Sequence, residues 1–234
     1  MIRTEDHGDV RVVTLDRPER RNALTLEGLA DLERAVTGAE PPVVYLTGAG
    51  GAFSAGADFD VVSEAGAEGR AAIEAFVERG QRTMRAIEAA ESAVVAGVDG
   101  PARGGGVELA LACDLRVATP GATFAETGVS LGLFGAWGGT VRLPEVVGTG
   151  DALDLSLSGR TVDAETALRM GLVQRVVPEP RSVAEELAGN DPDALRALKR
   201  LVRADGDREA REAREREAFV DLLSGRAADL GAGD

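Results

Sequence analysis

The amino-acid sequence predicts a mixed α/β fold followed by a charged, helical C-terminal segment. A short apolar run that leads into a glycine-rich loop occurs twice, at 43–51 and 93–106, and the second loop opens into a helix. After 178–180, Pro-Glu-Pro, the composition changes to charged helical segments. The 234 residues suffice for one domain with a small appendage, which we place at 1–178 and 179–234.

Strands and helices are expected to alternate along the chain. Runs of β-branched or apolar residues bounded by Pro or Gly indicate strands, and apolar residues at helical spacing indicate helices. The predicted strands are 10–15, 43–47, 93–98, 115–118, 123–124 and 172–177. The predicted helices are 25–36, 70–89, 107–112, 138–147, 151–157, 164–170, 183–188, 194–202 and 208–223. A turn is expected at 17–21, and the segment before residue 70 is predicted to be a polar loop.

The charge balance excludes several classes of partner. The 40 Asp and Glu residues outnumber the 26 Lys and Arg residues, which gives a net charge of −14, so nucleic-acid phosphates would be repelled. Lys199 is the only lysine, and this acid excess predicts adaptation to molar salt, a halophilic protein. With 28% charged residues and an acidic N-terminus, we expect no membrane span and no signal peptide, and a cytoplasmic protein.

The few histidines and cysteines exclude most metal and nucleophilic chemistry. Because Cys113 is the only cysteine and His7 the only histidine, neither a disulfide framework nor a Cys-rich zinc site is expected. Cys113 is predicted to be a buried hydrophobe. Ser54 lies in a sequence that resembles a nucleophile elbow, but it has no credible histidine base. The loop 48–53 matches half of a dinucleotide fingerprint, but no helix starts there, so NAD is not expected.

The second glycine-rich loop has a more specific pattern. In Gly104-Gly-Gly-Val-Glu108 the glycines expose backbone N–H groups at a helix N-terminus, where they favour negative charge. Glu108 follows Gly105 by three residues and therefore lies on the same helical face. This is half of an oxyanion hole with a carboxylate beside it. The same residues also fit a purely structural role, in which the glycines allow close packing and Glu108 favours the helix dipole.

Ordered motifs along almost the whole chain resemble those of the crotonase (enoyl-CoA hydratase/isomerase) family. They are LDRPERRNAL at 15–24, TGAGGAFSAGAD at 47–58, GPARGGGVELALACD at 100–114, GAWGGTVRLP at 135–144 and SGRTVDAETALRMGLV at 158–173. The resemblance implies a ββα spiral core with a helical C-terminal trimerisation segment, assembled as a homotrimer or a hexamer of two trimers. It also implies an acyl-CoA thioester substrate and no cofactor beyond the coenzyme A of that substrate.

The resemblance also implies roles for individual residues. The backbone N–H groups of Ala57 and Gly105 would hold the thioester oxygen, and donors of this type contribute about 3–4 kcal/mol each in other systems. Arg20 or Arg21 would lie near the CoA phosphates, since a guanidinium can bind two phosphate oxygens. The full set of implied CoA and substrate contacts is Arg20, Arg21, Ala23, Ala55, Ala57, Asp58, Phe59, Asp60 and Gly105.

One departure from the family pattern affects the predicted reaction. Family hydratases use two glutamates, and this chain keeps Glu108 but has Gly128 at the second position. Glu126 is the nearest substitute, and in an extended segment it would face the same way as residue 128, about 6.6 Å along the strand. The favoured interpretation of Glu126 is an ordinary polar residue near the cleft rim, with the catalytic substitute as the alternative.

The first-choice function is therefore an enoyl-CoA hydratase that depends on Glu108. The alternatives are a 3,2-enoyl-CoA isomerase, thioester hydrolysis or decarboxylation at the same site, or a noncatalytic acyl-CoA-binding subunit. Trp137 and Phe134 flank a glycine-rich turn and are predicted to pack in the core rather than line the acyl pocket. Arg103 is expected at the surface.

Overall fold

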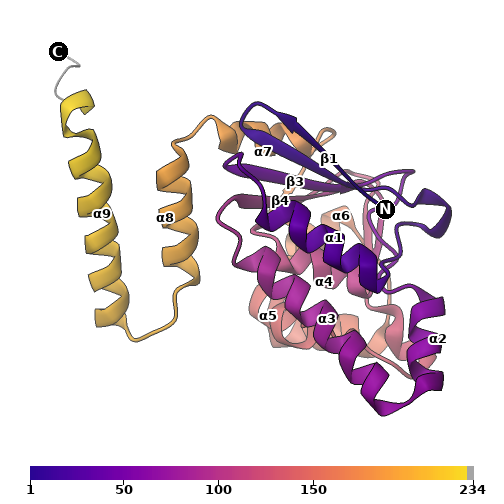
Figure 1. The fold of residues 1–234 in the computed structure, drawn as a ribbon. Coiled ribbons are helices and arrows are strands. Elements are labelled where there is room, and N and C mark those ends of the chain that lie inside the picture. The colour runs from indigo at the N-terminus through magenta and orange to yellow at the C-terminus, as the bar shows by residue number, and fades with distance from the viewer. Residues whose placement is uncertain (231–234) are drawn as a thin grey trace.

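Two β-sheets form the framework of the computed structural model, which describes residues 1–230 (Figure 1). The larger sheet contains, in spatial order, β1 (Ile2–His7), β2 (Val10–Leu15), β3 (Val43–Gly48), β4 (Ala93–Val98), β6 (Leu115–Ala118) and β9 (Arg175–Val176). The smaller sheet contains β5 (Pro101–Arg103), β7 (Thr123–Ala125) and β8 (Val162–Asp163). All neighbouring strands are parallel except β1 on β2 and β8 on β7.

The chain repeats a path from the large sheet to the small sheet and then into a helix. β4 leads to β5 and then to α4 (Gly105–Ala112), and β6 leads to β7 and, after η2 (Thr127–Leu131), to α5 (Gly139–Ser158). The turn that starts at β3 has the same form, because Ser54 forms a parallel bridge to Ala102 in β5. This repeat is the ββα spiral that the sequence resemblance implied, with α6 (Ala164–Arg169) and η1 (Pro18–Arg20) as short additions.

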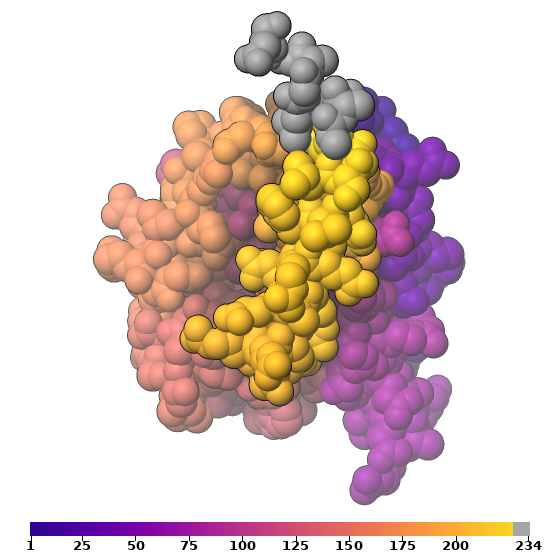
Figure 2. Space-filling model, turned by 90° about the vertical axis from the view of Figure 1, so that its left-hand side faces the viewer, coloured from indigo at the N-terminus to yellow at the C-terminus, as the bar shows by residue number. Residues whose placement is uncertain are grey.

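Helices cover both faces of the large sheet. α1 (Leu26–Thr37) and α3 (Arg70–Glu88) pack with α4 into the main core, where Leu32, Met84 and Leu109 are fully buried. α7 (Arg181–Ala188) packs through Val183 on the other face, so this helix lies against the sheet. By contrast, α8 (Pro192–Arg203) and α9 (Arg208–Leu230) extend from the spiral in Figure 1, and Figure 2 looks onto the exposed length of α9.

Most predicted elements are confirmed, and the exceptions have physical reasons. The predicted loop before residue 70 is wrong, because α2 (Phe59–Glu68) begins there with the Asp58 side chain as its N-terminal cap. β1 was not predicted, since its exposed, charged residues give no alternation and it depends on pairing with β2. The predicted strand 172–177 is confined to β9. Gly148, with φ of 78°, separates the two predicted halves of α5.

The single residues that the sequence placed in the core or at the surface have mixed outcomes. Trp137 and Cys113 are buried as predicted, and burial raises the pKa of the Cys113 thiol to about 12. Phe134 was predicted to be buried, which is wrong: 72% of it is exposed, because it lies on the outer turn after η2. Arg103 is half-buried rather than at the surface, and its guanidinium donates to the carbonyl oxygens of Ala102 and Thr123. No helix within residues 1–230 is long and apolar enough to cross a membrane.

Candidate active site

Three residues of the predicted site each follow an extended segment, and these three segments lie side by side at the small sheet. Ala57 follows the Ser54 bridge, Gly105 follows β5, and Glu126 follows β7. Ser54 pairs with β5, and β5 pairs with β7, in both cases in parallel. Parallel strands end at the same edge of a sheet, and ligands of α/β proteins bind at such edges. The topology therefore brings these residues to one end of the small sheet.

The backbone N–H groups of Ala57 and Gly105 lie close together because both segments are glycine-rich. A Cβ added to Gly56 would lie 2.7 Å from the Gly105 nitrogen, and a Cβ added to Gly105 would lie 3.3 Å from the Ala57 nitrogen. Leu24 fixes the first segment, since it donates to the Gly56 oxygen and accepts from Asp58 N–H. Within residues 1–230, neither the Ala57 nor the Gly105 N–H donates to another backbone group. Both remain available for an oxygen of a ligand.

Glu108 is held rigidly in the first turn of α4. Its side chain is buried, and its Oε1 accepts hydrogen bonds from the backbone N–H groups of Trp137 at 2.8 Å and Gly139 at 2.7 Å. Burial raises the pKa of Glu108, whereas these two bonds and the charge of Arg142 act to lower it. The Glu108 carboxyl also needs a glycine at position 135, because a Cβ there would lie 2.7 Å from the Glu108 carboxyl carbon.

Glu126 is buried in a contrasting way. Its Oε1 has no hydrogen-bond partner, and burial, together with the charge of Glu108, raises its pKa to about 8. The carboxyl lines a small, mainly apolar cavity with Phe134, Leu143 and Gly139, the residue that also binds Glu108. Glu126 is therefore neutral near pH 7 and adjoins the Glu108 site.

The predicted geometry around Gly128 is wrong in one respect. The segment is not extended, because residues 127–131 form η2, so Glu126 is not displaced from residue 128 along a strand. Gly128 itself lies against the backbone of the next turn, where a Cβ would meet the Phe134 Cα at 3.0 Å. The usual second-glutamate position is therefore closed to a side chain unless this turn shifts.

Apart from Gly105, the residues implied as CoA contacts lie on two adjacent segments, at 20–23 and 55–60. Ala55 N–H donates to the Arg21 oxygen at 2.8 Å, which joins the turn at η1 to the loop before α2. Arg20 forms an exposed ion pair with Asp60 at 3.1 Å, and Phe59 is 66% exposed.

The Asp58 side chain, in contrast, is used inside the fold. Its Oδ2 accepts from Arg17 at 2.5 Å, and Arg17 also donates to the Ala23 oxygen. Although burial opposes ionisation, the bonds from Arg17 and from the Asp60 N–H lower the pKa of Asp58. Asp58 thus fixes the loop that carries the Ala57 N–H.

Sequence reasoning missed the residues that hold Glu108. Trp137 and Gly139 lie 29 and 31 residues further along the chain, and they contribute backbone N–H groups that any residue type except proline would supply. Only the glycine pattern at 135–139 gave a signal, since Gly135 and Gly139 leave room for the carboxylate. Among residues 1–230 there is no group of three or more His, Cys, Asp or Glu that could hold a metal ion.

Two free backbone donors beside two buried carboxyls can stabilise charge on a carbonyl oxygen and move protons at the neighbouring carbons. On a ββα spiral, these features define the crotonase class of fold. The chain belongs to the enoyl-CoA hydratase/isomerase family, whose family model matches residues 5–226.

Relatives and solved structures agree with this assignment. The chain is 37% identical over 211 residues to the short-chain-enoyl-CoA hydratase of Clostridium acetobutylicum, covering 85% of this chain and 79% of the relative. It is 38% identical to the crotonyl-CoA hydratase of Syntrophomonas wolfei, covering 83% and 78%. The crystal structure of enoyl-CoA hydratase from Thermoplasma volcanium is similar, with a TM-score of 0.89, 31% identity, and coverage of 99% and 95%.

Proposed function

We propose that this protein adds water to a 2-enoyl-CoA thioester and thereby forms a 3-hydroxyacyl-CoA. The observation that carries the proposal is the pair of buried carboxyls, Glu108 and Glu126, next to the free N–H groups of Ala57 and Gly105. Two relatives with 37% and 38% identity have names that specify hydration of short enoyl-CoA and crotonyl-CoA. The reaction requires no cofactor beyond the coenzyme A of the substrate.

The two N–H groups bind the thioester oxygen. As water attacks C3, negative charge develops on this oxygen through the conjugated system, and the fixed donors stabilise it more in the transition state than in the ground state. Gly105 is the first residue of α4, so its N–H lies at the positive end of that helix. Ala57 supplies the second donor from the opposite segment.

The carboxyls move two protons in opposite directions. Glu108, as carboxylate, takes a proton from water while the oxygen–C3 bond forms and the C2–C3 double bond shifts to the enolate. Glu126, as neutral acid, gives a proton to C2, which regenerates the thioester carbonyl. One water is consumed, and a proton then returns from Glu108 to Glu126. The pKa of about 8 for Glu126 supports its role as the proton donor near neutral pH.

A hydration assay with crotonyl-CoA tests this proposal. We expect turnover, followed as loss of the enoyl-thioester absorbance in molar KCl, and its disappearance in Glu108→Gln with binding of the CoA ester retained. Activity of the variant equal to that of the parent protein would contradict the role of Glu108. If the parent protein binds the ester without turnover, then 3-enoyl-CoA isomerisation, thioester hydrolysis and decarboxylation are the next assays. Failure of all of them would identify a noncatalytic binding subunit.

We further propose that the C-terminal segment 179–234 assembles a homotrimer or a hexamer through α8 and α9. Large apolar side chains are exposed on these helices, including Val202 at 73% and Phe219 at 65%. Exposed apolar clusters of this kind are typical of protein interfaces. Residues 231–234 of the segment lie outside the described residues. Sedimentation equilibrium distinguishes the two assemblies, and a monomer would contradict both.

We also propose that the protein works in the cytoplasm of a halophilic cell. The net charge of −14 creates self-repulsion that molar salt screens, since the Debye length is about 3 Å at 1 M. The melting temperature is expected to rise between 0.1 and 2 M KCl. A melting temperature that stays constant or falls over this range would contradict the salt adaptation.

A further inference from the structure

The turn that binds Glu108 is itself held by a charged side chain. Arg142 lies in the first turns of α5, and its Nη1 donates to the Trp137 oxygen at 3.3 Å. A Cβ on Gly138 would lie only 2.1 Å from this Nη1, so the guanidinium lies directly on the turn. The N–H groups of Trp137 and Gly139, on the same turn, bind Glu108 Oε1. Arg142 therefore contacts the backbone segment that fixes the carboxylate, without touching the carboxylate itself.

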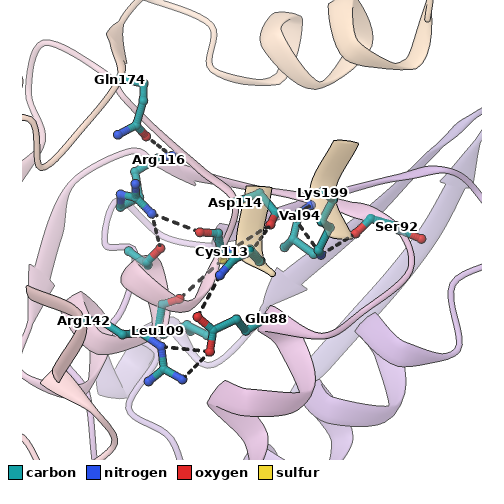
Figure 3. Close-up of polar contacts among 12 residues, drawn as sticks. Glu88, Ser92, Val94, Leu109, Cys113, Asp114, Arg116, Arg142, Gln174 and Lys199 are labelled. Carbon is teal, nitrogen blue, oxygen red and sulfur yellow. Dashed lines mark hydrogen bonds and ion pairs between the residues drawn. The ribbon is translucent and has the colours of Figure 1, made fainter. Parts of the chain in front are cut away.

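Arg142 is oriented by a partly buried ion pair with Glu88, whose side chain is 32% exposed. Its Nη2 and Nε donate to Glu88 Oε2 at 2.7 and 3.3 Å, and only 12% of the Arg142 side chain is exposed. Figure 3 shows the two side chains pointing toward each other from α5 and α3. Glu88 Oε1 accepts from Arg203 of α8 at 2.7 Å. These bonds orient the guanidinium, and Arg203 links the same glutamate to the C-terminal segment.

We propose that Arg142 is a positioning residue for Glu108: it orients the 137–139 turn whose N–H groups bind the Glu108 carboxylate, and Glu88 holds it there. This inference deepens the proposed function and rests on it. Its electrostatic consequence is that the positive charge of Arg142 favours the ionised form of Glu108, the form that accepts a proton from water.

Several other charged groups lie near Glu108 and Arg142. Glu108 is influenced by the charges of Arg142, from α5, and of Glu126, which follows β7. The charged groups that line the cavity around Arg142 are Arg85 and Glu88 from α3, Glu145 from α5, Arg203 from α8 and Asp205 after it. Of these, Glu88 forms the ion pair with Arg142, and Arg203 acts through Glu88.

A pH profile with three variants tests the proposal. In Arg142→Gln we expect kcat to fall about 10-fold with KM nearly unchanged, and the acidic limb of kcat to move to higher pH, because Glu108 loses the charge that favours its ionised form. Arg142→Lys is expected to restore the limb while recovering kcat only in part, since an ammonium lacks the planar fork whose separate nitrogens bind Glu88 and the Trp137 oxygen. Arg85→Gln, which removes a cation from the same cavity without an ion pair to Glu88, is expected to leave both unchanged.

A second readout separates this proposal from the hydratase proposal. The titration of the Glu108 carboxyl is followed by ¹³C NMR, with the signal assigned by its loss in Glu108→Gln. We expect the midpoint of this titration to move upward in Arg142→Gln. If Arg142→Gln does not fold, Glu88→Gln is measured instead, and we expect its kcat to fall at unchanged KM. A Glu108 titration that is the same with and without Arg142 overturns the positioning role, even in a protein that hydrates no substrate.

Discussion

The two buried glutamates of the site differ in how the fold accommodates their charge. Glu108 and Glu126 are 2% and 8% exposed, so both lose nearly all contact with water. Glu108 accepts two backbone hydrogen bonds and is influenced by Arg142, whereas Glu126 Oε1 has no partner and its pKa is raised to about 8. Burial raises the pKa of both carboxyls, but the two backbone donors and the charge of Arg142 counteract this rise for Glu108 alone.

This difference supports the roles that we propose for the two carboxyls and that the sequence left open. A hydratase needs one group that accepts a proton and one that donates it at the same pH. Two carboxyls with the same surroundings would have the same intrinsic pKa, so nothing would distinguish the proton acceptor from the proton donor. Of the two carboxyls, only Glu108 accepts hydrogen bonds from the turn at 137–139, and these bonds favour its ionised form.

Removal of the Glu108 carboxylate is expected to have the largest effect. Glu108→Gln retains the shape of the side chain but cannot accept a proton, so turnover should fall by about 1,000-fold or more. Stopped-flow or steady-state kinetics of crotonyl-CoA hydration measure the loss of turnover, and calorimetry measures binding of a nonreactive CoA ester. Unchanged affinity is the control for the fold of the site. A loss of less than 10-fold would mean that Glu108 is not the base.

Replacement of Glu126 is expected to have the next largest effect. Glu126→Gln removes the proton donor, so kcat should fall about 100-fold. In the parent protein, activity should decline as pH rises through about 8, where Glu126 ionises. The variant should lack this basic limb. A variant that keeps the same limb would show that another group is responsible for it.

The same residue predicts the pH dependence of stability. The pKa of Glu126 is raised from 4.5 to about 8 on folding, so its stabilising contribution is complete below pH 4.5 and is lost as pH rises through about 8. The free energy of unfolding should therefore decrease by several kcal/mol between pH 5 and 9, and less in Glu126→Gln. Urea unfolding at both pH values measures the difference. If the free energy of unfolding changed equally with pH in the parent protein and in Glu126→Gln, the burial of this carboxyl would be contradicted.

A small change in the space around the Glu108 carboxylate is expected to have a moderate effect on kcat. In Gly139→Ala the new Cβ would lie 2.9 Å from Glu108 Oε1, so the carboxylate must move while the N–H donor remains. We expect kcat to fall about 10-fold with little change in stability, since misplacement by about 1 Å costs up to 100-fold. Gly150→Ala is the matched control in the same helix, because a Cβ there meets nothing within 4 Å. Equal kcat in the two variants would contradict the close packing of Gly139 against the Glu108 carboxylate.

Restoration of the usual second glutamate is expected to have the smallest effect. In Gly128→Glu the Cβ would lie 3.0 to 3.1 Å from backbone atoms of residues 133 and 134, so the variant should lose about 1–2 kcal/mol of stability and gain no activity. Gly128→Ala carries the same Cβ without the carboxyl and should show the same stability loss. Higher activity in Gly128→Glu than in Gly128→Ala would show that the turn opens and that Glu126 is dispensable.

The local patterns in the sequence predicted most of the fold and part of the site. The glycine-rich loops, most of the strand positions and the position of Glu108 at the start of α4 depend on neighbouring residues, so they could be recognised directly. The exposed strand β1 and the helix α2 were missed because their stability depends on pairing and packing with other elements.

The amino-acid sequence by itself determined the α/β class, the two donor loops and the presence of acidic residues near the second one. Only the tertiary structure decided what those acids can do. Glu126 and Glu108 are 18 positions apart, and their surroundings differ because a turn 29 to 31 residues beyond Glu108 donates hydrogen bonds to Glu108 and not to Glu126. A carboxyl's charge state depends on the water it loses and the donors it gains, and both are set by contacts between distant segments.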